Sequence, residues 1–229
     1  MRLKRRIADA FIKGCGLRNL HNSKPQKLVR TFLDEIDLQH LRDVHPCSCF
    51  DDRSEMFRFV QESCIKAEAL DYLEFGVFQG ESIRKWASLN NHPESRFFGF
   101  DSFEGLPDDW REGQGKGHFN VRGQMPQIDD PRVKFVKGWF ENTIPPFVRD
   151  FTVRNRLVLH IDSDLYSSAM LALVHFAPFM SKGTVLIFDE FYDRDNEFKA
   201  LMDWQRIYKK GFRVIAQMGD YGKICAELL

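Results

Sequence analysis

Three acidic side chains follow two apolar segments of the sequence and could act together at one site. Asp162 comes directly after the apolar segment 157–161, and Asp189 and Glu190 come directly after the segment 184–188. If both segments are parallel strands of one sheet, their carboxyl ends meet at the edge where open α/β sheets bind ligands. Unpaired carboxylates so close together repel one another, and a divalent cation is the simplest relief. The sequence therefore predicts a metal site, and direct contacts between these carboxylates and a substrate are the alternative.

A second group of residues is suited to binding a nucleoside. Glu74 precedes Gly76 and Gly80 in the loop after an apolar segment, and Asp101 ends the next apolar segment. In dinucleotide-type folds, an acid about 20 residues beyond such a loop contacts the ribose hydroxyls. The loop has two glycines where a pyrophosphate site has three, and the carboxylate of Glu74 would repel phosphate. The pattern favours S-adenosylmethionine, which carries a sulfonium, an ammonium group and a ribose but no phosphate.

The spacing of apolar residues predicts the elements that hold these side chains. Besides the strands that precede the acidic residues, a short strand is expected at 133–136 and a hairpin at 212–217 and 223–228. Helical spacing covers 169–180 and 197–210. We therefore predict an α/β fold with a doubly wound, Rossmann-like sheet of seven strands.

The N-terminal part of the chain has a different pattern. Residues 1–68 are predicted to form a helical cap region that covers one face of the sheet, and 69–229 the catalytic domain. Leu3, Ile7 and Phe11 share one helical face beside several basic residues. This segment is expected to pack on its own domain or on a partner subunit, which would allow a homodimer. Attachment to an anionic membrane surface is the alternative.

The composition bears on partners and location. The chain has 33 basic and 33 acidic residues, so its formal net charge is zero and no nucleic-acid partner is predicted. The basic N-terminus lacks the apolar segment of a signal peptide, and no transmembrane segment is predicted. The five cysteines lack zinc spacing, and His45, Cys47 and Cys49 have no fourth metal ligand nearby. We interpret them as reduced thiols of a cytoplasmic protein.

Four motifs, in order, resemble those of a known enzyme family. EFGVFQG resembles the first motif of class I methyltransferases, and FGFDSFEGLP and KGWFENTIPPF resemble the second and third motifs of the macrocin O-methyltransferase family. HIDSDLYSS, followed by Asp189 and Glu190, is similar to the metal motif of that family. The resemblance runs from about residue 70 to the C-terminus and implies a class I methyltransferase fold that binds S-adenosylmethionine. The cofactor-binding residues expected from these motifs are Glu74, Gly76, Val77, Phe78, Gly80, Ser82, Asp101, Ser102, Phe103, Gly138, Trp139 and Asp162.

The resemblance also implies a metal. In metal-dependent relatives, acids after the fourth and fifth strands hold magnesium, and by position the ligands here are Asp162, Asp189 and Glu190. Glu190 stands where Asp or Asn is more usual, so its longer side chain would shift the metal or replace it. Leu165 stands where the related catechol type has a lysine base.

The implied reaction is methyl transfer to a hydroxyl of a saccharide or of a glycosylated small molecule, as in natural-product or polysaccharide modification. The expected catalytic residues are Asp162, Glu190 and His118. Tyr192 is a further candidate for the base, and His160, inside a predicted strand, is interpreted as a packed side chain.

The segment 108–130, which contains His118, has no regular periodicity and is predicted to be a mobile lid over the acceptor. Two other functional classes stay open. A nicotinamide-dependent oxidoreductase shares the strand, helix, strand opening and Asp101, and a binding module would keep the cofactor without catalysis.

Overall fold

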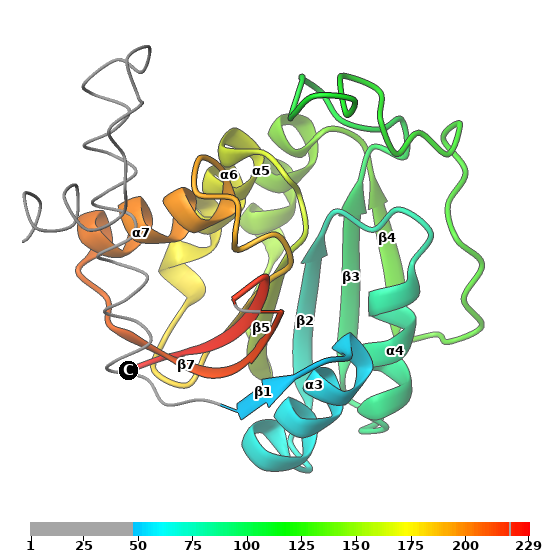
Figure 1. The fold of residues 1–229 in the computed structure, drawn as a ribbon. Helices are drawn as coiled ribbons and strands as arrows, with labels where there is room; N and C mark the ends of the chain where they lie inside the picture. The colour runs from blue at the N-terminus through cyan, green and yellow to red at the C-terminus, as the bar shows by residue number, and fades with distance from the viewer. Residues whose placement is uncertain (1–47, 220) are drawn as a thin grey trace, which may run out of the picture. The chain divides into compact units, whose positions relative to one another are not determined.

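Eight strands form one mixed sheet in the computed structural model, which describes residues 48–219 and 221–229 (Figure 1). The strands are β1 (Ser48–Phe50), β2 (Leu70–Phe75), β3 (Arg96–Asp101), β4 (Val133–Lys137), β5 (Arg156–Ile161), β6 (Val185–Phe188), β7 (Phe212–Met218) and β8 (Lys223–Leu228). The helices are α3 (Arg53–Val60), a π-helical turn η1 (Gln61–Ile65), α4 (Glu81–Leu89), α5 (Phe140–Asp150), α6 (Tyr166–Phe176), a 3-10 turn η2 (Ala177–Phe179) and α7 (Glu197–Tyr208).

The strand order is β1-β7-β8-β6-β5-β2-β3-β4. Strands β2 to β6 pair in parallel, and β8 pairs antiparallel with both β6 and β7. The order reverses between β2 and β5, so the ends of these two strands form the switch point where open α/β sheets bind ligands. The predicted doubly wound sheet is confirmed.

The short strand β1 was not expected. The sequence analysis assigned residues 1–68 to a helical cap, yet Ser48–Phe50 pairs in parallel with β7 and adds an eighth strand at the edge of the sheet. Both β1 and α3 belong to the same compact unit as the sheet. The remainder of the predicted cap, residues 1–47, lies outside the described residues, and so do His45, Cys15 and Cys47.

Alternating side chains of the central strands build two cores. Helices α3 and α4 cover one face, with Phe57 and Trp86 packed on Tyr72 and Phe97. On the other face, α5 and α6 bury a cluster of phenylalanine rings, which includes Phe75 stacked on Phe100 at a centroid distance of 5.0 Å. Because side chains alternate along a strand, Tyr72 and Glu74 of β2 point to the α3 and α4 side. No helix among the described residues has the length and apolar character needed to cross a bilayer.

Candidate active site

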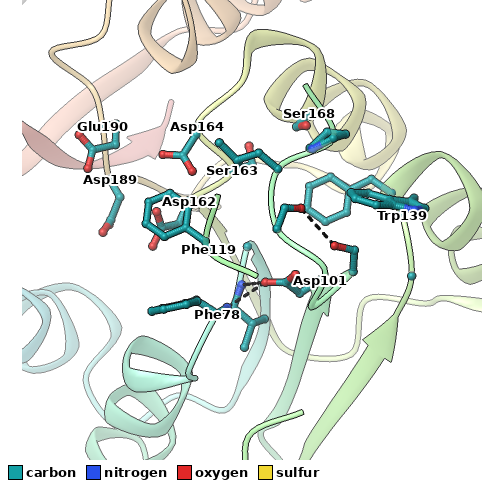
Figure 2. A pocket seen from close by; sticks show the side chains of 18 of the residues that line it. Phe78, Asp101, Phe119, Trp139, Asp162, Ser163, Asp164, Ser168, Asp189 and Glu190 are labelled. Atoms are coloured by element: carbon teal, nitrogen blue, oxygen red, sulfur yellow. Dashed lines mark hydrogen bonds between the residues drawn. The ribbon is translucent and has the colours of Figure 1, made fainter. Parts of the chain in front are cut away.

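A cavity of about 270 Å³ lies at the carboxyl ends of the central strands (Figure 2). Residues just after five parallel strands line it, together with Arg53 of α3, Lys223 of β8 and Phe119. Ten of the residues predicted from the sequence are in this lining: Gly76, Val77, Phe78, Asp101, Ser102, Gly138, Trp139, Asp162, Asp189 and Glu190. The structure therefore brings most of the predicted site together.

The loop after β2 passes very close to the loop after β5. Gly76 has φ +95°, and a β-carbon on it would lie 1.7 Å from the carbonyl oxygen of Asp162. The backbone N–H of Gly76 donates to Phe100, and that of Asp162 donates to Phe75, each at 2.9 Å. Any side chain at Gly76 would separate these loops, which explains the glycine through packing of the backbone.

Asp101 shapes the same loop. Its Oδ2 accepts the N–H groups of Val77 and Phe78, both at 2.8 Å, and its Oδ1 accepts that of Phe103 at 2.6 Å. The carboxylate also lines the cavity. Asp101 is thus both a wall of the cavity and the anchor of the loop after β2.

Five predicted residues are absent from the lining. The carboxylate of Glu74 is fully buried beneath the cavity, where the hydroxyls of Tyr72 and Ser82 donate to it. A β-carbon on Gly80 would face the side chain of Pro126 and not the cavity. Because all three residues face the protein interior, the direct cofactor contacts expected of Glu74, Ser82 and Gly80 find no support in the lining and stay predictions.

The other two are Phe103 and His118. The ring of Phe103 is buried edge-on against Phe135, at a centroid distance of 6.1 Å. The imidazole of His118 lies beside Phe119, 4.3 Å between centroids, with Nε2 3.3 Å from the side-chain nitrogen of Gln114. Phe119, and not His118, is the residue of this segment that reaches the cavity.

His160 does more than pack. Its Nδ1 lies 2.7 Å from the hydroxyl of Tyr72, and its Nε2 lies 2.9 Å from Oδ1 of Asp189. The single hydroxyl proton of Tyr72 is donated to Glu74, so the Tyr72 oxygen accepts from Nδ1. Both imidazole nitrogens therefore donate, which makes the buried ring an imidazolium. Burial lowers the pKa of His160, but Asp189 and Glu74 outweigh burial and raise the pKa to about 10.

Asp189 is surrounded by positive charge. Oδ2 lies 2.6 Å from Nζ of Lys223 and 3.1 Å from a terminal nitrogen of Arg53, while Oδ1 bonds to His160. Burial by itself would raise the pKa of Asp189, but the contacts with His160 and Lys223 prevail and hold the pKa below its usual range. Asp189 stays ionised although it is only 2% exposed.

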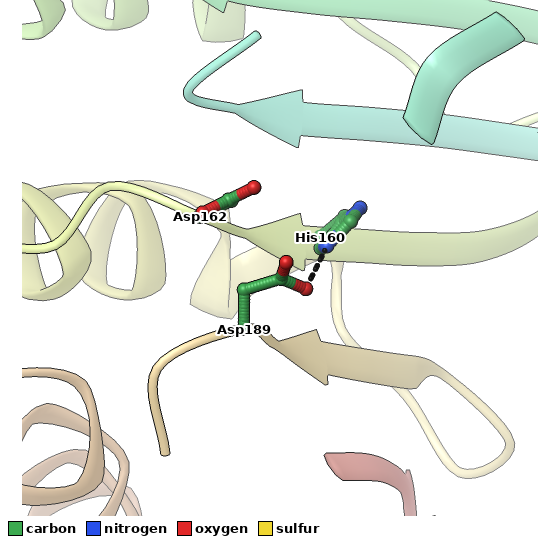
Figure 3. A group of neighbouring side chains, drawn as sticks. All are labelled: His160, Asp162 and Asp189. Carbon is green, nitrogen blue, oxygen red and sulfur yellow. Dashed lines mark hydrogen bonds and ion pairs between the residues drawn. The ribbon is translucent and has the colours of Figure 1, made fainter. Parts of the chain in front are cut away.

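The predicted magnesium site coincides with these contacts of His160 and Asp189. Among the described residues, His160, Asp162 and Asp189 form a group whose ligand atoms lie within 4.8 Å of one another (Figure 3). Glu190 is not part of this group. Both nitrogens of His160 donate hydrogen bonds, and both oxygens of Asp189 already face cations. Mg²⁺ needs several free oxygen ligands in octahedral geometry, so the arrangement does not fit it.

Asp164 was missed in the sequence. It lines the cavity two residues beyond Asp162, with φ 62°. No donor among the described residues bonds its carboxylate, and Glu190 lies beside it (Figure 2). Burial, followed by the charge of Glu190, raises the pKa of Asp164 to about 7. The second acid of the D-S-D sequence directly after a strand was the signal that would have found it.

Glu197 holds the two acidic loops in place. This fully buried residue begins α7, and its Oε1 accepts the N–H groups of Ser163 and Asp164 at 2.9 and 3.1 Å. Its Oε2 faces the N–H of Glu190 at 3.4 Å. The relative positions of the acids after β5 and β6 thus depend on one buried carboxylate.

The predicted lid is tied to the segment after β6. The indole N–H of Trp110 donates to Asp193 at 2.8 Å, and Arg111 donates to the hydroxyl of Tyr192 at 2.8 Å. Tyr192, a candidate base, is 51% exposed and is not in the lining. These hydrogen bonds join the two segments, and each segment contributes to the lining, through Phe119 and Glu190 respectively.

Strand order and site together define the class of protein. A sheet that reverses at the β2 and β5 ends and terminates in the β7 and β8 hairpin is the class I methyltransferase fold, with one strand added at the edge. A solved structure of the O-methyltransferase NovP has the same fold, with a TM-score of 0.60, 22% sequence identity and coverage of 76% of this chain and 78% of that chain.

The family follows from the sequence match. Residues 53–219 match the macrocin O-methyltransferase (TylF) family, and the chain belongs to it. A rhamnosyl-tetracenomycin C 4'-O-methyltransferase of Streptomyces olivaceus is 30% identical over 142 residues, which are 53% of this chain and 52% of that protein. Demethyldecarbamoylnovobiocin O-methyltransferase of Streptomyces niveus is 26% identical over 159 residues, 58% of this chain and 59% of that protein. The matches thus span little more than half the length of these relatives.

Proposed function

We propose that the protein transfers a methyl group from S-adenosylmethionine to a hydroxyl of a sugar or of a glycosylated small molecule. The observation that carries this proposal is one cavity lined by the loop after β2 on one side and by Asp162, Asp164 and Glu190 on the other. The first side is suited to the cofactor, and the second presents acids to an acceptor.

The cofactor side is suited to a cation. The loop after β2 has its N–H groups at Val77 and Phe78 bonded to Asp101, so these groups do not form a phosphate cradle. The carboxylates around the cavity favour the sulfonium and ammonium groups of S-adenosylmethionine. Asp101 would accept from the ribose hydroxyls, and the indole of Trp139 would lie against the adenine. A pyrophosphate would meet negative charge instead.

The acceptor side supplies a base. An oxygen of the acceptor attacks the methyl carbon while the carbon–sulfur bond breaks. The electron pair of the broken bond stays on the sulfur, which becomes a neutral thioether. The hydroxyl proton must leave in the same event. Asp164 lines the cavity, and no donor among the described residues bonds its carboxylate, so we assign it as the acceptor of that proton. Asp162 and Glu190 flank it.

The acceptor class is supported by the relatives. One relative is named for a rhamnosyl-tetracenomycin and another for a demethyldecarbamoylnovobiocin. Both names describe natural products, and the first states its sugar. A hydroxyl of a glycosylated natural product is therefore the acceptor to test first.

Magnesium dependence is not part of this proposal, because the ligand atoms of Asp189 and His160 are already engaged in contacts with each other and with Lys223. A homodimer and a cytoplasmic location stay predictions.

Calorimetry and a transfer assay test the proposal. S-Adenosylhomocysteine should bind with a stoichiometry of one per chain, and NAD should give no heat of binding. Label from methyl-labelled S-adenosylmethionine should then appear in rhamnosides or related glycosides. Binding of NAD alone would indicate an oxidoreductase, and binding of S-adenosylhomocysteine without transfer to any glycoside would indicate a cofactor-binding module.

A further inference from the structure

We propose that the ammonium group of Lys223 is the resident cation of the acceptor site and takes the place of a divalent metal. The inference rests on the proposed methyl transfer for its role in turnover. The part of the proposal that concerns structure, namely that Lys223 excludes a metal ion, can be tested by a binding measurement that needs no turnover.

The register of the sheet places Lys223 opposite Asp189. Strands β6 and β8 are antiparallel, and Phe188 pairs with Ile224. Asp189, which follows Phe188, therefore faces Lys223, which precedes Ile224. The ammonium group lies 2.6 Å from Oδ2 of Asp189 and 3.4 Å from its carbonyl oxygen. Its side chain is 19% exposed and also lines the cavity. Strand pairing thus fixes the backbone of Lys223, and the contacts with Asp189 hold its ammonium group.

The charge of Asp189 is neutralised without a metal, because three cationic groups already contact its carboxylate. Lys223, Arg53 and the imidazolium of His160 contribute three positive charges. A divalent cation placed among them would have to displace Lys223 or face electrostatic repulsion from it, because like charges a few ångströms apart repel strongly where water is partly excluded.

The identity of residue 190 agrees with this arrangement. An Asp or Asn at this position would be a short ligand beside Asp189, whereas the longer side chain of Glu190 lies beside Asp164 and outside the group formed by His160, Asp162 and Asp189.

The ammonium group can do for the acceptor what a metal does. It presents protons toward the cavity, so it can hold the acceptor oxygen by a charge-assisted hydrogen bond. As the hydroxyl proton moves to Asp164, the positive charge stabilises the developing alkoxide until the bond to the methyl carbon forms. The sulfur keeps the electron pair of the broken bond, and Lys223 neither gains nor loses a proton.

Binding of Mn²⁺, measured by electron paramagnetic resonance, tests the proposal. Mn²⁺ is a spectroscopic substitute for Mg²⁺ at oxygen sites. The wild-type protein should bind it no better than the control variant Lys182→Met, which changes an exposed lysine remote from the lining. Lys223→Met should raise Mn²⁺ affinity by on the order of a hundredfold, because it uncovers Asp189. Lys223→Arg keeps the charge and should exclude Mn²⁺ as the wild type does.

Turnover provides the second measurement. Wild-type turnover should be unchanged in excess chelator, and Lys223→Met should lower kcat on the order of a hundredfold while the affinity for S-adenosylhomocysteine changes less than about twofold. Thermal unfolding of Lys223→Met and Lys223→Arg shows whether the fold is intact. Tight Mn²⁺ binding by the wild type, or loss of wild-type turnover in chelator, overturns the proposal. The Mn²⁺ measurement tests the exclusion of a metal by Lys223 even if the protein methylates no glycoside.

Discussion

The carbonyl oxygen of Asp162 lies 1.7 Å from the position that a β-carbon would occupy on Gly76. This contact joins the loop expected to hold the cofactor to the loop that carries the acids of the acceptor site. Gly76→Ala should therefore disturb both, and we expect a loss of more than about 3 kcal/mol in the free energy of unfolding, from overpacking and positive φ together. Denaturant unfolding measures it. Gly211→Ala, whose β-carbon would meet Leu229 no closer than 3.6 Å, should change stability little. Equal stability of the two variants would contradict the close approach of residue 76 to the carbonyl oxygen of Asp162.

Asp101→Ala should weaken cofactor binding through the loop as well as through the ribose. Three backbone N–H groups lose their acceptor when the carboxylate is removed. We expect a loss of about 2 kcal/mol, or roughly thirtyfold, in the affinity for S-adenosylhomocysteine measured by calorimetry. Glu104→Ala, an exposed neighbour, is the control. An unchanged affinity in a folded Asp101→Ala variant would show that Asp101 does not contribute to cofactor binding.

Asp164→Asn should separate catalysis from cofactor binding. The substitution keeps the size of the side chain but removes its ability to take a proton, so kcat should fall by on the order of a hundredfold or more. The affinity for S-adenosylhomocysteine should change less than about twofold, and Asp108→Asn, an exposed loop variant, should behave as the wild type. Full turnover by Asp164→Asn would assign the base elsewhere, with Glu190 the next carboxylate to test.

Asp71→Asn should lower stability in a manner that depends on pH. Burial raises the pKa of Asp71, but Arg96 and the N–H groups of Arg154 and Asn155 prevail and hold the pKa below its usual value of 3.8. The ionised carboxylate therefore stabilises the fold above pH 3.8, and this contribution is lost as pH falls through the lower, folded-state pKa. At pH 7 the variant should lose about 3 kcal/mol, because Arg96 keeps no charged partner.

The measurement for Asp71 is urea unfolding at several pH values. The difference between wild type and Asp71→Asn should be constant from neutral pH to about pH 5 and should shrink below pH 3.8. Asp150→Asn changes an exposed carboxylate that has no such partners within residues 48–219 and 221–229, and it should show no comparable effect. A difference that persists unchanged into acid would mean that packing, and not charge, accounts for the loss.

Local patterns in the sequence predicted the central strands well. The seven strands from β2 to β8 have apolar segments bounded by Gly or an acid, and the residues at their ends were correctly placed at one edge of the sheet. The helix α5 was not predicted, because Pro145 and Pro146 lie inside it and each removes a helical hydrogen-bond donor. Its ring contacts, such as Phe147 on Phe100 at 4.9 Å, compensate through tertiary packing that no local pattern reveals.

The contacts that distinguish the site are equally nonlocal. Glu74 was expected to touch the cofactor because it ends a strand, but the alternation of side chains turns it toward Tyr72 and His160. Lys223 gave no signal of a site, since its partner Asp189 is 34 residues away and is reached only through strand pairing. The position of an acid can be predicted from the strand that it follows in the sequence. The cations that neutralise it can be predicted only when the pairing register of the strands is known.

The pairing of β1 with β7 has a consequence for the protein as it emerges from the ribosome. Cys49 of β1 contacts Gln217 of β7 across a separation of 168 residues. At a synthesis rate of about 5–20 residues per second, a nascent chain waits on the order of ten seconds before this partner strand exists. During that interval β1 has no strand to pair with, so its backbone donors and acceptors are exposed to water and to whatever chaperones attend translation.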